Sequence, residues 1–184
     1  RLLKQDENDV FARVSRAGAY MIQRNYDKAY LDYKKLSETS ATMDIPDVQE
    51  GLAIVSSHIG KLDDAEKAYG KLLKKNASPG TQINLAELYI VRGKYEKALK
   101  LLDSDTLLRS ADKFMKCISS YLAASALLAT GKDAGEYMKV FNELLPQFRK
   151  GTEDIDWDTA LFEKWLKTAK LPQGAAEKIA DMTR

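Results

Sequence analysis

The sequence predicts an all-α fold built from helical hairpins that stack on one another. A short phrase recurs three times, each copy consisting of a turn, a large apolar residue, two polar residues and an alanine. Its large apolar residues, Tyr26, Leu62 and Tyr95, lie 36 and then 33 residues apart, and such a period is typical of stacked helical repeats. Nowhere does the sequence sustain the alternation of apolar and polar residues that marks a strand. The three phrases are residues 24–29, 60–65 and 93–98.

Helical spacing of apolar residues predicts the elements of the first three hairpins. In the first element Val10, Val14, Ala17 and Met21 recur at the intervals of one buried helical stripe. Further helices are expected where similar stripes follow each turn phrase. The predicted helices span residues 10–24 and 27–39, 47–59 and 63–74, and 79–92 and 95–102.

Capping residues support these boundaries. Pro46 and Pro79 suit the first turn of a helix, where the missing N–H of proline costs nothing. Ser78 can accept a hydrogen bond from an amide in the first turn that has no helical partner. Gly60 and Gly93 are expected to end the helices that precede them.

The pattern is less regular after Leu102. A fourth hairpin is predicted from helices over residues 111–130 and 133–145, and Pro146 is expected to interrupt it. A polar hinge over 151–156 and two shorter helices, 157–169 and 175–182, follow. The predicted organisation is thus a repeat array over residues 1–150 and C-terminal helices over 151–184. The units of the array are residues 10–43, 46–77, 79–105 and 111–149.

The repeated residues resemble the tetratricopeptide repeat family. The family places a small residue and a tyrosine in the first helix of a unit, then a turn, an alanine and an aromatic residue. The first unit offers Ala17, Tyr20, Tyr26, Ala29 and Tyr33, the second Ala53, Gly60, Leu62, Ala65 and Tyr69, and the third Ala86, Tyr89, Gly93, Tyr95 and Ala98. The resemblance covers about residues 10–105 and implies a right-handed solenoid of three to four units, whose first helices line a concave surface.

The register implied by the resemblance predicts the partner-binding residues of that surface. Most of them are apolar, and an exposed apolar face usually marks an interaction site. The predicted residues are Phe11, Val14, Met21, Ile22, Glu50, Ile54, His58, Ile83, Glu87, Ile90, Val91, Ile118 and Tyr121. The same register places Gly18, Asp47, Ser57, Gly80, Ser125 and Leu128 on this surface.

The predicted C-terminal helix over 157–169, with the residue Ile155 before it, has an apolar stripe. The stripe consists of Ile155, Trp157, Leu161, Phe162, Trp165 and Leu166. One interpretation is that this helix caps the open end of the last hairpin, as the terminal unit of a repeat array must. The alternative is that it lies in the concave groove as an internal ligand. The general need for a cap favours the first interpretation.

Several functional classes are not supported. A net charge of +2 indicates neither nucleic acid nor an anionic membrane as partner. A single Cys117 and a single His58 cannot build a zinc site, and neither stands at a spacing typical of nucleophilic catalysis. The longest apolar stretch, residues 117–129, is too short to span a bilayer. We therefore expect no metal, no cofactor, no membrane insertion and no enzymatic activity.

Ligand recognition by a carboxylate clamp, as in family members that bind chaperone termini, is also not expected. Val14, Gly18, Gly51, Gly80 and Asn84 stand at clamp positions that would need lysine, asparagine or arginine, and only Asn84 is a polar match.

Two functions are left. The favoured hypothesis is a non-catalytic adaptor that binds a protein, a peptide or an amphipathic helix through the apolar concave groove. The alternative is a structural module that packs the same face on another copy, as a homodimer, or on a neighbouring domain. One cysteine favours the cytoplasm and does not exclude the periplasm.

Overall fold

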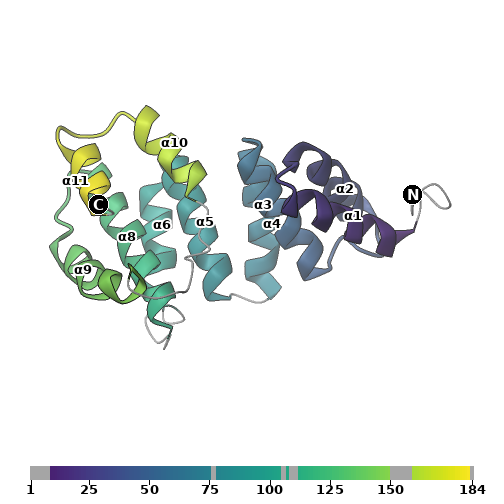
Figure 1. Ribbon diagram of the computed structural model, residues 1–184, viewed down its shortest axis with the longest axis horizontal. Coiled ribbons are helices and arrows are strands. Elements are labelled where there is room, and N and C mark those ends of the chain that lie inside the picture. The colour runs from purple at the N-terminus through teal and green to yellow at the C-terminus, as the bar shows by residue number, and fades with distance from the viewer. Residues whose placement is uncertain (1–8, 76–77, 105–106, 108–111, 150–158, 183–184) are drawn as a thin grey trace. The chain divides into compact units, whose positions relative to one another are not determined.

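The computed structural model describes residues 9–75, 78–104, 107, 112–149 and 159–182, and over these residues the fold is all-α, as predicted (Figure 1). The described elements are helices, without strands. They are α1 (Val10–Ile22), α2 (Tyr26–Glu38), α3 (Pro46–His58), α4 (Leu62–Lys75), α5 (Pro79–Val91), α6 (Tyr95–Leu102), α8 (Lys113–Ala129), α9 (Gly135–Arg149), α10 (Ala160–Thr168) and α11 (Ala175–Asp181).

The helices form two compact units, and each unit is built from hairpins. Unit 1 (Arg1–Asn76) holds the hairpins α1–α2 and α3–α4, and α2 packs against α3. Unit 2 (Ala77–Arg184) holds the hairpins α5–α6 and α8–α9, with α5 and α6 both against α8. The C-terminal helices α10 and α11 belong to unit 2. The boundary predicted at residue 150, and the hinge over 151–156, lie outside the described residues.

The turns of the four hairpins share one geometry, which explains the repeated phrase. Each has a residue in the left-handed region, where glycine is favoured because it lacks a Cβ. The next N–H donates to the carbonyl five residues earlier, which closes the helix end. The left-handed residues are Arg24, Gly60, Gly93 and Gly131, with φ of 55°, 76°, 69° and 71°. The closing bonds are Asn25–Tyr20 (2.8 Å), Lys61–Ser56 (2.8 Å), Lys94–Tyr89 (2.7 Å) and Lys132–Leu127 (2.9 Å).

The predicted caps are confirmed at two helix starts. Pro46 begins α3, and Pro79 begins α5 at the expected first position. The Ser78 hydroxyl accepts a hydrogen bond of 3.1 Å from the Thr81 amide. These residues fix where the first helices of the second and third hairpins begin.

Pro146 does not interrupt the fourth hairpin, contrary to the prediction. It lies inside α9, which continues to Arg149. A proline in a helix leaves the carbonyl four residues earlier, here that of Asn142, without its usual amide donor. Both Asn142 and Pro146 are exposed, so water can satisfy that carbonyl.

Small residues let the helices approach closely in the core. Ala17, Ala29, Ala53 and Ala98 are fully buried. Cys117 is buried in α8, as expected for a core residue, and burial raises the pKa of its thiol to about 11. A protonated thiol is a poor nucleophile, so this side chain acts in packing.

Candidate interaction surface

The shared turn geometry defines which positions of the four first helices are equivalent. Counting back from the left-handed residue of each turn, Gly18 of α1 corresponds to Ile54 of α3, Glu87 of α5 and Ser125 of α8. The predicted surface residues occupy five such positions in α1, α3 and α5, and four of the same positions in α8. We call the surface formed by these positions the first-helix face, and it can be described for each unit separately.

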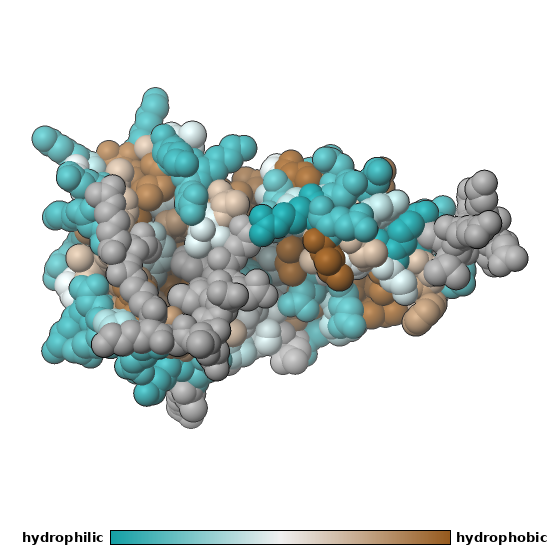
Figure 2. Space-filling view, viewed as in Figure 1, coloured by the Kyte–Doolittle hydropathy of each residue, from teal (hydrophilic) through white to brown (hydrophobic). Residues whose placement is uncertain are grey.

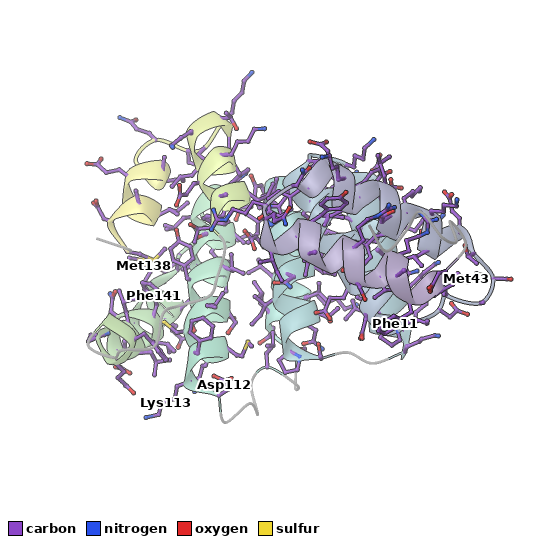
Figure 3. All side chains as sticks on the ribbon, turned by 45° about the vertical axis from the view of Figure 1, so that its right-hand side comes forward. Phe11, Met43, Asp112, Lys113, Met138 and Phe141 are labelled. Carbon is purple, nitrogen blue, oxygen red and sulfur yellow. The ribbon has the colours of Figure 1, made fainter. Side chains whose placement is uncertain are left out.

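The first-helix face of unit 1 is open at its apolar positions. Phe11 lies near the start of α1 (Figure 3) and Ile22 at its end. Their side chains are 80% and 88% exposed. Val14 and Met21 between them are half-buried, and so are Ile54 and His58 of α3. The space-filling view shows hydrophobic residues at the surface of both units (Figure 2). However, the exposed large apolar side chains of the described residues all lie in unit 1. Besides Phe11 and Ile22 they are Val10, Leu31, Met43 and Ile45.

Ion pairs between Asp32 of α2 and two arginines of α1 help to hold α1 in place. Asp32 of α2 is buried and accepts hydrogen bonds from the Arg16 guanidinium, at 2.7 Å from Nε and 2.5 Å from Nη2. It also accepts one of 3.1 Å from Nη1 of Arg13. Sequence reasoning missed this cluster. A signal existed, because Asp32 shares the buried stripe of α2 with Ala29 and Leu36, and a buried carboxylate requires a cationic or hydrogen-bonding partner.

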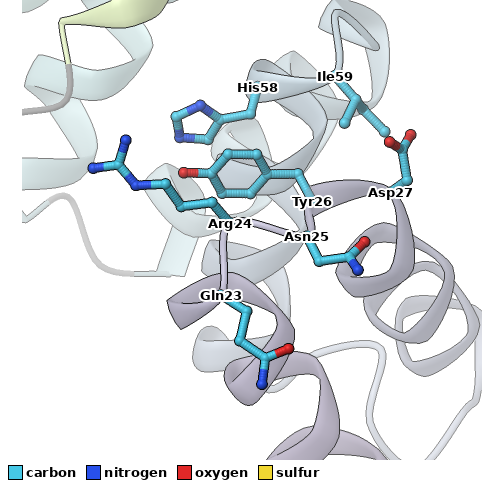
Figure 4. A pocket seen from close by; sticks show the side chains of 7 residues that line it. All are labelled: Gln23, Arg24, Asn25, Tyr26, Asp27, His58 and Ile59. Atoms are coloured by element: carbon cyan, nitrogen blue, oxygen red, sulfur yellow. The ribbon is translucent and has the colours of Figure 1, made fainter.

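His58, predicted as a binding residue, lies at the end of this face against the first hairpin turn. Its ring stacks on that of Tyr26, with the ring centroids 4.0 Å apart and the planes 3° from parallel (Figure 4). The two residues line an open pocket of about 580 Å³. The other lining residues are Gln23, Arg24, Asn25, Asp27 and Ile59. The stacking joins the end of α3 to the start of α2, so we interpret His58 as a packing residue.

The first-helix face of unit 2 is covered. Ile83, Glu87 and Ile90 of α5 are buried, and Ile118 and Tyr121 of α8 are buried as well. Val91 is half-buried against the same core. The prediction that these residues lie on an open surface is therefore corrected.

The covering elements are the C-terminal helices. α10 packs against α5, and α11 packs against α8. Phe162 of α10, 1% exposed, contacts Tyr121 with ring centroids 5.4 Å apart, and Trp165 contacts Phe162 at 4.8 Å. The C-terminal helices therefore lie on first helices. This arrangement corresponds to the less favoured interpretation of the sequence, in which the tail lies in the groove. The expected apolar positions Ile155 and Trp157 lie outside the described residues.

Burial also governs the polar groups in this covered face. The pKa of Tyr121 is raised above the ordinary tyrosine value, mainly by burial and further by the nearby carboxylates of Glu163 and Glu87. The phenol therefore stays neutral, as suits a core tyrosine.

Metal sites and membrane spans were not expected from the sequence. In the described ranges, no three His, Cys, Asp or Glu side chains lie close enough to bind a metal ion together. No helix in the same residues is both long and apolar enough to cross a membrane.

Comparisons with known proteins leave the chain without an assigned family. No protein-family model matches the sequence, and no curated protein is significantly similar to it.

Proposed function

We propose that this chain is a non-catalytic protein-interaction module of the tetratricopeptide type. It binds a peptide or an amphipathic helix through the first-helix face of unit 1. The observation that carries the proposal is the exposure of Phe11 and Ile22, whose counterparts Ile118 and Val91 in unit 2 are buried and half-buried against a core.

The energetic argument concerns the apolar area of α1. Burying a large apolar side chain stabilises a complex by roughly 1.5–3 kcal/mol before the costs of association. Phe11 and Ile22 lie three helical turns apart, with Val14 and Gly18 between them, so one elongated ligand can contact all four. A few such anchors usually carry most of the affinity of an interface.

The test compares partner capture by three forms of the full chain. The forms are the native protein, the double variant Phe11→Asp with Ile22→Asp, and the control Leu31→Asp. Leu31 is 67% exposed on α2, so its replacement changes the apolar surface of the same unit outside the first-helix face. Circular dichroism checks that all three forms are folded.

We expect quantitative mass spectrometry to find a protein retained by the native chain and by Leu31→Asp but lost from the double variant. Partners retained equally by all three forms would contradict the proposal. Sedimentation of the same proteins tests the alternative. If the native chain and Leu31→Asp sediment as homodimers and the double variant sediments as a monomer, this face serves self-association.

A further inference from the structure

We infer that the ligand of unit 1 is an amphipathic helix from another protein, with two aromatic anchors one turn apart and lysine or arginine beside them. This inference rests on the proposed function and names the chemistry of the partner. In unit 2 the C-terminal helices cover the first-helix face. We compare the residues at these covered positions with the residues at the equivalent positions of unit 1.

Unit 2 contains an example of the interaction. In α10 the aromatic residues Phe162 and Trp165 are three positions apart, so they lie on the same side of the helix. Both are buried in the core that includes Ile83 and Ile90 of α5. The residues between and after them, Glu163, Lys164 and Lys167, are exposed. A short amphipathic helix with an aromatic pair is therefore a ligand that this type of face accepts.

The apolar half of unit 1 matches this example and has more room. Val14 and Met21 of α1 occupy the positions of Ile83 and Ile90. At the position of Glu87, α1 has Gly18, and a Cβ added there would meet no atom within 4 Å. Space without a side chain between apolar neighbours suits a large aromatic group, because the ring can contact the helix backbone and bury more area.

The other half differs in charge. At the positions of Ile118 and Tyr121 of α8, α3 has Asp47 and Glu50, and both are exposed. A ligand that faced α3 with apolar side chains would remove water from these carboxylates without compensation. Basic side chains would instead gain favourable electrostatic interactions, which also speed association. The partner helix therefore needs lysine or arginine on the side that faces α3.

A second copy of this chain is a poor occupant. Its own aromatic pair, Phe162 and Trp165, is 1% and 5% exposed in unit 2, and releasing it would uncover a core. The helix is therefore expected from another protein.

The experiment uses the full chain and synthetic peptides derived from residues 159–170. The first peptide carries Glu163→Lys, which gives α10 a basic flank. The second adds Phe162→Ala and Trp165→Ala to remove the anchors. The third keeps the aromatic pair but carries Lys164→Glu and Lys167→Glu in place of the basic change. Fluorescence anisotropy of the labelled peptides measures the dissociation constants.

We expect the first peptide to bind. The second peptide, which lacks both anchors, should bind at least about tenfold more weakly, the size of effect that loss of one buried anchor produces. The third peptide, with acidic in place of basic side chains, should also bind at least about tenfold more weakly. Phe11→Asp with Ile22→Asp, and separately Gly18→Leu, should weaken the first peptide by a similar factor. Asp47→Lys with Glu50→Lys should weaken the first peptide and strengthen the third. Leu31→Asp should leave all affinities unchanged.

Equal binding of all three peptides, or no effect of the unit 1 variants, would overturn the inference. A peptide could instead displace the chain's own α10 from unit 2. In that case the affinity of the peptide would change with Ile83→Ala in unit 2 and would not change with Gly18→Leu in unit 1. The proposed function fails separately. If a captured protein requires Phe11 and Ile22 but none of its helices has an aromatic pair and a basic flank, the proposed function holds and only this inference is lost.

Discussion

Equivalent faces of the two units have opposite environments. In unit 1 Val14 and Met21 of α1 are half-buried, and Phe11 and Ile22 at its ends are exposed. In unit 2 Ile83 and Ile90 of α5, at the positions of Val14 and Met21, are buried in a core that includes Phe162 of α10. The hairpins are built alike, with the same left-handed turn and the same small residues between helices. The comparison teaches that one repeat position can be buried in a core or open to solvent, depending on which segment covers it.

The largest expected effect separates aromatic residues on the two faces. Phe162→Ala should destabilise unit 2 by about 3–5 kcal/mol, because it removes a fully buried ring and leaves a cavity. Phe11→Ala, which removes an exposed ring, should change stability by no more than about 0.5 kcal/mol. Urea unfolding followed by tryptophan fluorescence and by circular dichroism measures both. Similar costs for the two variants would erase the proposed difference between the faces.

The next effect compares ion pairs. Asp32→Ala should cost unit 1 about 3 kcal/mol, because it leaves the nearly buried Arg13 guanidinium without its carboxylate. The control lies in unit 2, where Lys132 and Glu96 form an exposed pair at 2.7 Å. Lys132→Ala should cost less than about 1 kcal/mol. Hydrogen exchange, read on peptides from each unit, gives the local free energies of opening. A loss of protection spread equally over both units would show that Asp32 does not act locally.

Two glycines of unit 1 give a smaller contrast, of opposite sign. A Cβ at Gly51 of α3 would overlap the ring of Tyr33, so Gly51→Ala should cost about 1–3 kcal/mol. At Gly18 of α1 the added methyl group meets open space, and Gly18→Ala should stabilise the helix by about 0.5–1 kcal/mol. Thermal unfolding compares the two variants with the native chain. If both were destabilising, the open site that we infer at Gly18 would be in doubt.

The smallest effect is a pH dependence confined to unit 1. The Tyr30 hydroxyl donates a 2.6 Å hydrogen bond to Asp64, and this bond, more than the nearby Lys34, lowers the pKa of that carboxyl group. Its contribution to stability is present above the ordinary carboxyl pKa and is lost as the pH falls through the lowered value. Burial, followed by the bond to Asp64, raises the pKa of Tyr30 to about 12. The neutral phenol therefore stabilises the fold below pH 10, and this contribution is lost as the pH rises toward 12.

Tyr30→Phe should accordingly destabilise unit 1 by about 1 kcal/mol at neutral pH and reduce the loss of stability in acid. Tyr20→Phe is the control, because the described contact of Tyr20 is with the Lys28 ammonium over its ring, which phenylalanine retains. Urea unfolding at acidic, neutral and alkaline pH measures both variants. An unchanged acid dependence in Tyr30→Phe would assign the pH response to other carboxylates.

The first-helix residues predicted from sequence differ in burial between the units: Phe11, Ile22 and Glu50 of unit 1 are exposed, whereas most of those in unit 2 are buried. The turn phrase identifies equivalent positions in the first three hairpins, and the left-handed turn at Gly131 extends the same register to the fourth. The same register placed Glu87 and Tyr121 on an open surface, although both are buried. Local periodicity reports which side of a helix is apolar, and it does not report which distant segment covers that side.

The sequence by itself determined the all-α class, the turns at Gly60 and Gly93, the helix starts at Pro46 and Pro79 and the cap at Ser78. Each depends on residues within a few positions of one another, through backbone sterics, capping bonds and helical spacing. Only the tertiary structure decided that α10 packs against α5 and that Arg13 and Arg16 meet Asp32. Those outcomes depend on contacts between segments far apart in the chain. There, burial of apolar area and pairing of buried charge select one arrangement among several that the local pattern allows.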